Sequence, residues 1–224
     1  MSSPIKDLFG VRFKGNNLVA KVFFNAKHPA FPTTFFGLIA LTLSIYALGH
    51  GFGILSFLSF FAIGLVAWTL TEYMLHRFVF HWTSAKEPWR TIVAGLHLEH
   101  HQDPSDKYLI IASPLVALLL SGVLFGIFIL ATSFLTASVI MAGLYSGYIL
   151  YEWVHYGTHQ YKWKSKVGRY LTHHHLYHHF KRPDEAFGVT SGFWDRIFGT
   201  KKSFQGLAQP SPLTPQGAAN KAAS

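Results

Sequence analysis

Four long apolar runs alternate with polar segments along the chain. They cover residues 31–50, 51–75, 108–131 and 134–153. A helix needs about 20 apolar residues to cross the hydrocarbon core of a bilayer, and each run reaches that length. The links at residues 49–51 and 132–133 are short and carry no charge. The pattern therefore predicts an all-α integral membrane protein with four transmembrane helices, arranged as two helical hairpins.

The polar segments divide the chain into three parts. Residues 1–30 form a basic N-terminal segment, expected in the cytosol or at the bilayer interface, and residues 31–204 form the four-span domain. Residues 205–224 are rich in Gln, Pro, Ser, Ala and Gly, which predicts a disordered tail. A soluble four-helix bundle is the alternative architecture, but the apolar runs lack the polar face that its helices would need.

Positive charge predicts the orientation in the membrane. Of the 19 Lys and Arg residues, five lie in residues 1–30, four in 77–107 and nine in 155–205, and none lies in a hairpin tip. Cytoplasmic segments carry an excess of Lys and Arg, so we expect both termini and the intervening polar segments in the cytoplasm. A bacterial inner membrane and an endoplasmic reticulum membrane fit this charge pattern equally well.

Composition narrows the chemistry. The chain has no cysteine, which excludes disulfides, thiolate zinc sites and iron–sulfur clusters. Its net charge is +9, but the basic residues flank apolar runs and form no separate basic domain. We therefore expect a membrane surface as their partner, and no nucleic acid.

Ten of the 14 histidines fall into four short boxes in the polar segments. The boxes contain His76 and His81 (HRFVFH), His97, His100 and His101 (HLEHH), His155 and His159 (HYGTH), and His175, His178 and His179 (HLYHH). Residues three and four apart share one helix face, so the imidazoles of an HxxHH box can converge. Ten imidazoles are too many for one ion, and we expect two ions that share them. A low-complexity tract that only stores metal is the alternative, but these boxes have helical spacing.

Several residues near the boxes are expected to support them. Glu72 and Glu152 precede histidines by about one helical turn and are expected to accept an imidazole N–H. For Glu72 an interfacial carboxylate in water, or one paired with Arg77, is an equal alternative. His174 lies four residues before His178 and is expected beside the metal ligands, whereas Asp195 is expected to be a cap or loop residue. Imidazole-rich sites without bridging carboxylates suit redox chemistry better than hydrolysis, and they leave iron, copper, zinc and nickel open.

The combined box pattern resembles the membrane fatty acid hydroxylase/sterol desaturase superfamily. The stretch FGVTSGFWDRIFGT at residues 187–200, together with HYGTH, is most similar to the fatty acid 2-hydroxylase branch. The resemblance covers residues 30–200 and implies four spans under a cytosolic helical cap that holds two iron ions. It further implies a dioxygen-dependent insertion of oxygen into a lipid acyl chain, at carbon 2, with the ten histidines as ligands or their immediate shell. Zinc is expected as a substitute in a purified sample.

Some members of this branch carry a cytochrome b5 domain, but only 30 residues precede the first apolar run here. We therefore expect no haem and a separate electron donor, such as a cytochrome b5-like protein, a ferredoxin or a reductase. Trp153, Tyr156 and Tyr177 lie in or beside the boxes and are expected to wall the acyl slot, with an interfacial aromatic belt as the alternative.

Two other functions remain open at this point. A desaturase, a sterol oxidase or a carotenoid hydroxylase of the same superfamily would use the same oxidant. A membrane metal-binding or transport protein is the alternative outside enzymes. Transporters hold their ions near the bilayer midplane, whereas these boxes lie beyond the ends of the expected spans, which favours an enzyme.

Overall fold

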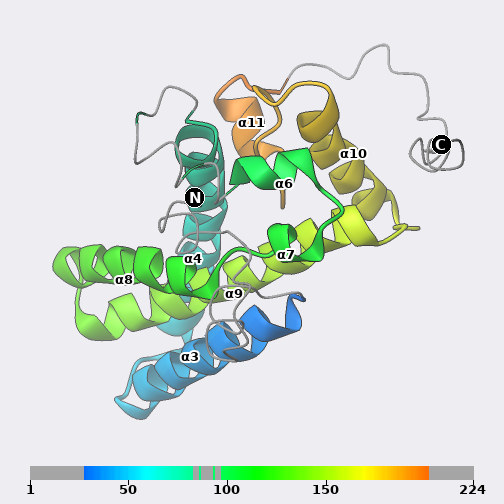
Figure 1. Cartoon of the computed structure of the whole chain (residues 1–224). Helices are drawn as coiled ribbons and strands as arrows, with labels where there is room; N and C mark the ends of the chain where they lie inside the picture. The colour runs from blue at the N-terminus through cyan, green and yellow to red at the C-terminus, as the bar shows by residue number, and fades with distance from the viewer. Residues whose placement is uncertain (1–27, 83–85, 87–92, 94–96, 202–224) are drawn as a thin grey trace, which may run out of the picture.

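A computed structural model of the chain describes residues 28–82, 86, 93 and 97–201, and these residues form helices and no strand (Figure 1). The long helices are α3 (Ala30–Gly49), α4 (Ile54–Met74), α8 (Pro114–Ala131) and α9 (Phe134–Gln160), and α4 continues into the π-helix η1 (Leu75–Phe80). A cap is formed by α6 (Glu99–Gln102), α7 (Lys107–Ile110), α10 (Lys166–Phe180) and α11 (Phe193–Ile197).

Four helices are long and apolar enough to cross a membrane, which confirms the predicted all-α, four-span architecture. They cover Ala30–Gly49, Ile54–Phe80, Lys107–Ala131 and Phe134–Gln160. Two of them run further than their apolar sequence predicts, because α9 continues past residue 153 to Gln160 and η1 prolongs α4 to Phe80. Two histidine boxes therefore stand on the ends of the spans themselves and are not in separate loops.

The last span, α9, is the centre of the bundle. Its residues between Ala137 and Tyr148 are largely buried, whereas the other three spans expose most of their apolar side chains. Helix α4 approaches it very closely, since a Cβ atom at Gly64 would lie 2.0 Å from the Ile140 carbonyl oxygen. A Cβ atom at Gly143 would likewise lie 2.1 Å from the Phe61 carbonyl oxygen. Small residues on both helices thus set the distance between α4 and α9, as is common for helices packed in a bilayer.

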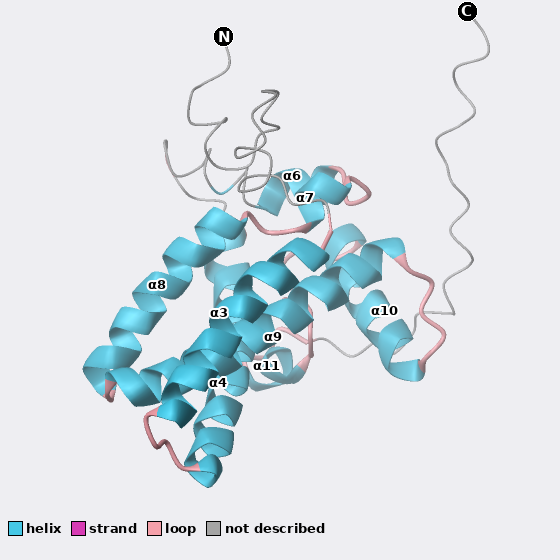
Figure 2. Ribbon diagram, turned by 90° about the horizontal axis from the view of Figure 1, so that it is seen from below, coloured by secondary structure: helices cyan, strands magenta, loops and turns pink. Residues whose placement is uncertain are grey.

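Figure 2 shows α8 and α10 on opposite sides of the group formed by α3, α4 and α9. Helix α10 packs against the end of α9, and Trp163 in the link between them lies against Gly157 and Gly168. Helix α11 lies over α4, where Trp194 Nε1 donates to Thr69 Oγ1 at 3.0 Å. The cap is therefore fastened to the two spans that carry histidines.

The predicted N-terminal segment at residues 1–30 and the predicted tail at residues 205–224 lie almost entirely outside the described residues. Within the N-terminal segment, α3 already begins at Ala30.

The contact between α4 and α9 generates a stability prediction. Gly143→Ala would place a methyl group against the Phe61 carbonyl, and overpacking of this kind costs about 1–3 kcal/mol. We expect a lower thermal unfolding temperature of the detergent-solubilised protein. Gly126→Ala is the matched control, because a Cβ atom there meets nothing within 4 Å. Equal losses in the two variants would contradict the close helix approach.

Candidate metal centre

The structure gathers the histidines of the four boxes into two groups of five. The first group is His76, His81, His97, His101 and His178, and the second group is His100, His155, His159, His175 and His179. Within each group, one ring nitrogen of every histidine lies within 4.8 Å of those of the others. All ten predicted histidines thus converge at two points, and no other histidine belongs to either group.

Each HxxHH box serves both groups. The first and last histidines of a box are four residues apart and point to one group, while the histidine just before the last points to the other group. His97 and His101 lie in the first group with His178, and His175 and His179 lie in the second group with His100. Neighbouring positions on a helix point about 100° apart, so a box between two sites reaches both of them. Because each box supplies histidines to both groups, the positions of the two groups depend on each other.

The spans supply one further pair to each group. His155 and His159 are four apart on α9 and belong to the second group. His76 and His81 are five apart, a spacing that does not share a face of an α-helix. Here the chain forms the π-helix η1 over Leu75–Phe80, whose wider turn brings both imidazoles into the first group. The five-residue spacing of the two histidines in HRFVFH is the feature of the sequence that indicates this π-helical turn.

The distances between the ring nitrogens fit a metal ion. The Nε2 atoms of His76 and His97, and of His97 and His101, lie 2.9 Å apart, and those of His81 and His178 lie 3.0 Å apart. In the second group the corresponding distances are 3.1 Å (His100–His155), 2.8 Å (His159–His175) and 3.1 Å (His175–His179). A metal–nitrogen bond of 2.0–2.1 Å places two ligands at right angles about 3.0 Å apart. The donor sets therefore suit a transition metal that accepts imidazole.

Burial keeps these imidazoles neutral at pH 7. Desolvation lowers the pKa of His81 to about 4 and is the largest cause that lowers the pKa of His101 and of His178 to about 3. For His101 and His178 the neighbouring imidazole of His81 lowers the pKa further, because two cations would repel. Neutral rings leave a lone pair free to bind a metal ion.

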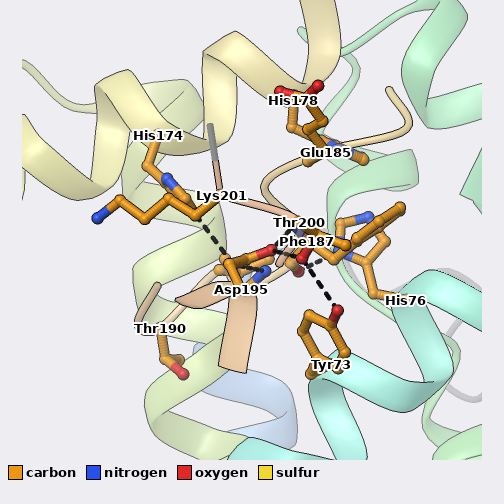
Figure 3. A network of polar contacts seen from close by, with 12 residues as sticks. Tyr73, His76, His174, His178, Glu185, Phe187, Thr190, Asp195, Thr200 and Lys201 are labelled. Carbon is orange, nitrogen blue, oxygen red and sulfur yellow. Dashed lines mark hydrogen bonds and ion pairs between the residues drawn. The ribbon is translucent and has the colours of Figure 1, made fainter. Parts of the chain in front are cut away.

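A loop between α10 and α11 orients two ligands of the first group (Figure 3). His76 Nδ1 donates to the Phe187 carbonyl, and His178 Nδ1 donates to the Glu185 carbonyl at 2.7 Å. Both hydrogen bonds place the proton on Nδ1 and leave Nε2 for the metal ion.

Asp195 holds this loop, and its role was not expected from the sequence, where it was interpreted as a cap or loop residue. Its carboxylate is fully buried and accepts from the N–H groups of Phe187 and Gly188 at 2.8 and 2.9 Å. It also accepts from Thr200 Oγ1 at 2.7 Å and His174 Nε2 at 3.2 Å. Burial alone would raise the pKa of Asp195, but hydrogen bonds, led by that of His174, hold it below its usual value. In the sequence, the only indication of a role for Asp195 was its position within the stretch 187–200.

Three residues expected to contact the ligands have other hydrogen-bond partners. Glu72 accepts from the N–H groups of Val189 and Thr190, because these loop amides have no helical partner. Glu152 accepts from Ala112 N at 3.2 Å, in the link that precedes α8. His174 binds Asp195, since its position on α10 faces α11 and not the metal groups.

An apolar cavity begins at the histidines and extends between the spans. Its lining includes His76 and His97 of the first group and His155 of the second. Beyond them it follows α4, α8 and α9 through Trp68, Leu75, Val116, Leu120, Ser121, Leu124, Leu144, Tyr145, Tyr148 and Tyr151. From His155 to Leu144 the cavity follows eleven residues of α9, or about 16 Å of helix. The structure therefore joins both histidine groups to a long space within the membrane-spanning region.

The three aromatic residues expected to wall an acyl slot lie outside this cavity. Trp153 Nε1 donates to Thr33 Oγ1 on α3 at 2.8 Å. Tyr156 packs with Ile110 and Ile111, and Tyr177 donates to Glu185 at 3.5 Å. These positions face other sides of α9 and α10, and their contact with a substrate stays a prediction. On α9 the aromatic residues of the cavity are Tyr145, Tyr148 and Tyr151, and Phe36, Trp68 and Phe80 line it from other elements.

The fold and the site together define a multi-span membrane protein with two all-histidine groups, each of which could hold a metal ion. A family model described as fatty acid hydroxylase matches residues 61–200. The dihydroceramide fatty acyl 2-hydroxylase FAH2 of Arabidopsis thaliana is 34% identical over 183 residues, which cover 81% of this chain and 76% of the relative. The chain belongs to the fatty acid hydroxylase family, and the predicted resemblance is confirmed.

Other relatives are also named as hydroxylases, and the chain covers a smaller part of their length. The ceramide very long chain fatty acid hydroxylase scs7 of Schizosaccharomyces pombe is 35% identical, and the matched residues cover 64% of this chain and 42% of the relative. The fatty acid 2-hydroxylase of Rattus norvegicus is 31% identical and is covered over 40% of its length. A solved structure of full-length scs7p, of which only the hydroxylase domain is visible, superposes with a TM-score of 0.76 at 28% identity and covers 88% of this chain and 76% of that one.

Metal content tests the assignment of the groups. We expect two transition-metal ions per chain in the purified protein, and His178→Ala to approach one ion after dialysis against a chelator, because the first group loses a ligand. His173→Ala is the control, since His173 lies on α10 but in neither group. The metal is quantified by mass spectrometry on the folded, monodisperse fraction. An unchanged content in His178→Ala would refute the grouping.

Proposed function

We propose that the protein is a di-iron, dioxygen-dependent membrane hydroxylase that inserts one oxygen atom into a C–H bond of a lipid acyl chain, at carbon 2. The observation that carries this proposal is the cavity that begins at histidines of both metal groups and continues between three spans. A chain inside it would meet the metal centre with one end while the rest lies among apolar side chains.

The lining of the cavity suits an acyl chain. Beyond the histidines the lining is aliphatic and aromatic, except for Thr71, Glu72, Ser113, Ser121 and the hydroxyls of three tyrosines. Ser121 and Tyr145 satisfy each other by a hydrogen bond of 3.0 Å, so they present no unpaired polar group to a hydrocarbon. A lipid could enter with its tail between the spans and keep its head at the bilayer surface.

Iron is proposed because the reaction needs a redox-active metal that accepts imidazole ligands. Bound iron would activate dioxygen and supply the oxidant for the C–H bond, which zinc cannot do because it has no redox chemistry. One oxygen atom enters the product and the other leaves as water, so each turnover consumes two electrons and two protons. A separate donor, such as a cytochrome b5-like protein, a ferredoxin or a reductase, supplies the electrons.

The position of attack rests on the relatives. Those from Arabidopsis and rat are named 2-hydroxylases, and all act on acyl or fatty acid groups by their names. We extend carbon 2 and the acyl chain to this protein, in which the histidines mark the end of the cavity where the head-proximal carbons would lie. The positive segments support a cytoplasmic location of both termini and of the site, in an endoplasmic reticulum or bacterial inner membrane.

Lipid mass spectrometry tests the reaction. Membranes from cells that express the wild type are expected to contain acyl lipids with one added oxygen, placed at carbon 2 by fragmentation. His178→Ala is expected to form no such product, while His173→Ala remains active. Loss of two hydrogens would indicate a desaturase, and oxygen on a ring lipid would indicate a sterol or carotenoid enzyme. Absence of every product from iron-loaded protein with an electron donor would refute the proposal.

The cavity predicts a dependence on chain length. Leu124 lies about 15 Å along α8 from Pro114, near the deep end of the lining. Leu124→Trp is expected to reduce turnover of long acyl chains at least tenfold more than that of short ones, with unchanged metal content. Leu119→Trp is the matched control, because Leu119 is 61% exposed and does not line the cavity. Equal effects on all lengths in Leu124→Trp would mean that the tail lies elsewhere.

A further inference from the structure

We infer that the two metal sites are unequal, and that Asp195 and Glu72 act as positioning residues for two ligands of the first site. The first group would then bind its metal ion more tightly than the second. This inference rests on the metal-binding part of the proposed function and is independent of which lipid is hydroxylated.

Two buried carboxylates hold four consecutive amides of one loop. Asp195 accepts from the N–H groups of residues 187 and 188 through its two oxygens, at 2.8 and 2.9 Å. Glu72 accepts from those of residues 189 and 190, and from the Thr190 hydroxyl at 2.6 Å. One carboxylate comes from α11 and the other from α4. The loop is therefore fixed from the cap and from a span at once.

The opposite side of this loop faces two metal ligands. The carbonyls of Glu185 and Phe187 accept from His178 and His76, and both histidines belong to the first group. Between these carbonyls Ala186 has a φ of 58°, in the left-handed region that non-glycine residues rarely adopt, and its N–H donates to the Thr200 carbonyl at 3.1 Å. The backbone turn that presents both carbonyls thus depends on its surroundings.

The second group lacks such a support among the described residues. The Nδ1 atoms of His100, His175 and His179 are buried and have no hydrogen-bond partner there. His155 is the exception in this group, because it has a hydrogen bond to the backbone of Ile110, and its Nδ1 lies 3.5 Å from the Tyr151 hydroxyl. Three of the five imidazoles are therefore held by packing and by their position on a helix alone.

This difference has a consequence for metal affinity. A hydrogen bond from the far ring nitrogen fixes the orientation and tautomer of a ligating imidazole, and loss of such a partner typically lowers metal affinity about 10–100-fold. The first group has two such bonds to a loop that is itself clamped, so its ion should dissociate more slowly. When metal is scarce, the second site would be the one left empty, although the reaction needs both.

Chelator-induced release from the zinc-loaded protein in detergent tests the inequality. We expect two phases of equal amplitude in the wild type, with rates that differ at least tenfold. His100→Ala should remove the fast phase and His178→Ala the slow one. A single phase for both ions, or the reverse assignment, would overturn the inference. If the protein bound no metal at all, both this inference and the proposed di-metal function would be refuted. Biphasic release without any hydroxylated lipid would refute only the proposed function.

Variants of the two carboxylates test their positioning role. In Asp195→Asn one oxygen becomes an NH₂ group that faces a backbone N–H, so two donors meet and the loop loses a hydrogen bond. Metal release in the slow phase should therefore accelerate about 10–100-fold, while the rate of the fast phase is unchanged. Glu72→Gln should have a smaller effect, because one amide oxygen can still accept both N–H groups and the Thr190 hydroxyl can accept from the NH₂. Asp184→Asn is the matched control, since this exposed carboxylate pairs with Arg182 in the same segment. Acceleration of both phases by Asp195→Asn would indicate general loosening and would overturn the positioning role.

Discussion

The convergence of ten imidazoles at two points is the constraint on which the rest of the structure depends. Rings whose nitrogens lie about 3 Å apart cannot be protonated together, because the cations would repel in a poorly solvated space. Burial keeps them neutral, and a metal ion is the natural partner of the lone pairs that then face each other. The fold must therefore bring five polar rings to each point and still bury them.

The helices meet this demand by continuing the spans into the cap. Helix α9 and the π-turn after α4 carry histidines on the same rigid elements that cross the bilayer, and glycines at their contact fix the distance between them. The two HxxHH boxes then join both groups, so displacing one cap helix would disturb both sites. The loop at residues 185–190 adds a rigid support to one group only.

The same arrangement provides a path from the membrane to the site. Helix α8 lies to one side of α9, and the cavity between it and α4 ends at His76, His97 and His155. The two histidine groups and a largely apolar cavity therefore adjoin each other. Under the proposed function, this continuity would let the domain act on a lipid that stays in the bilayer.

The sequence by itself determined the number of spans, the helical class and the identity of the converging histidines. These features depend on local composition and on spacing along one helix, which the residues directly encode. Only the tertiary structure decided how the boxes divide between two groups, because that depends on which helices face each other. It also decided that Asp195 and Glu72 clamp a loop and that Tyr156, Tyr177 and Trp153 lie away from the cavity. A carboxylate contacts whichever unpaired amide the fold brings to it, and that partner can be more than a hundred residues distant, as Val189 is from Glu72.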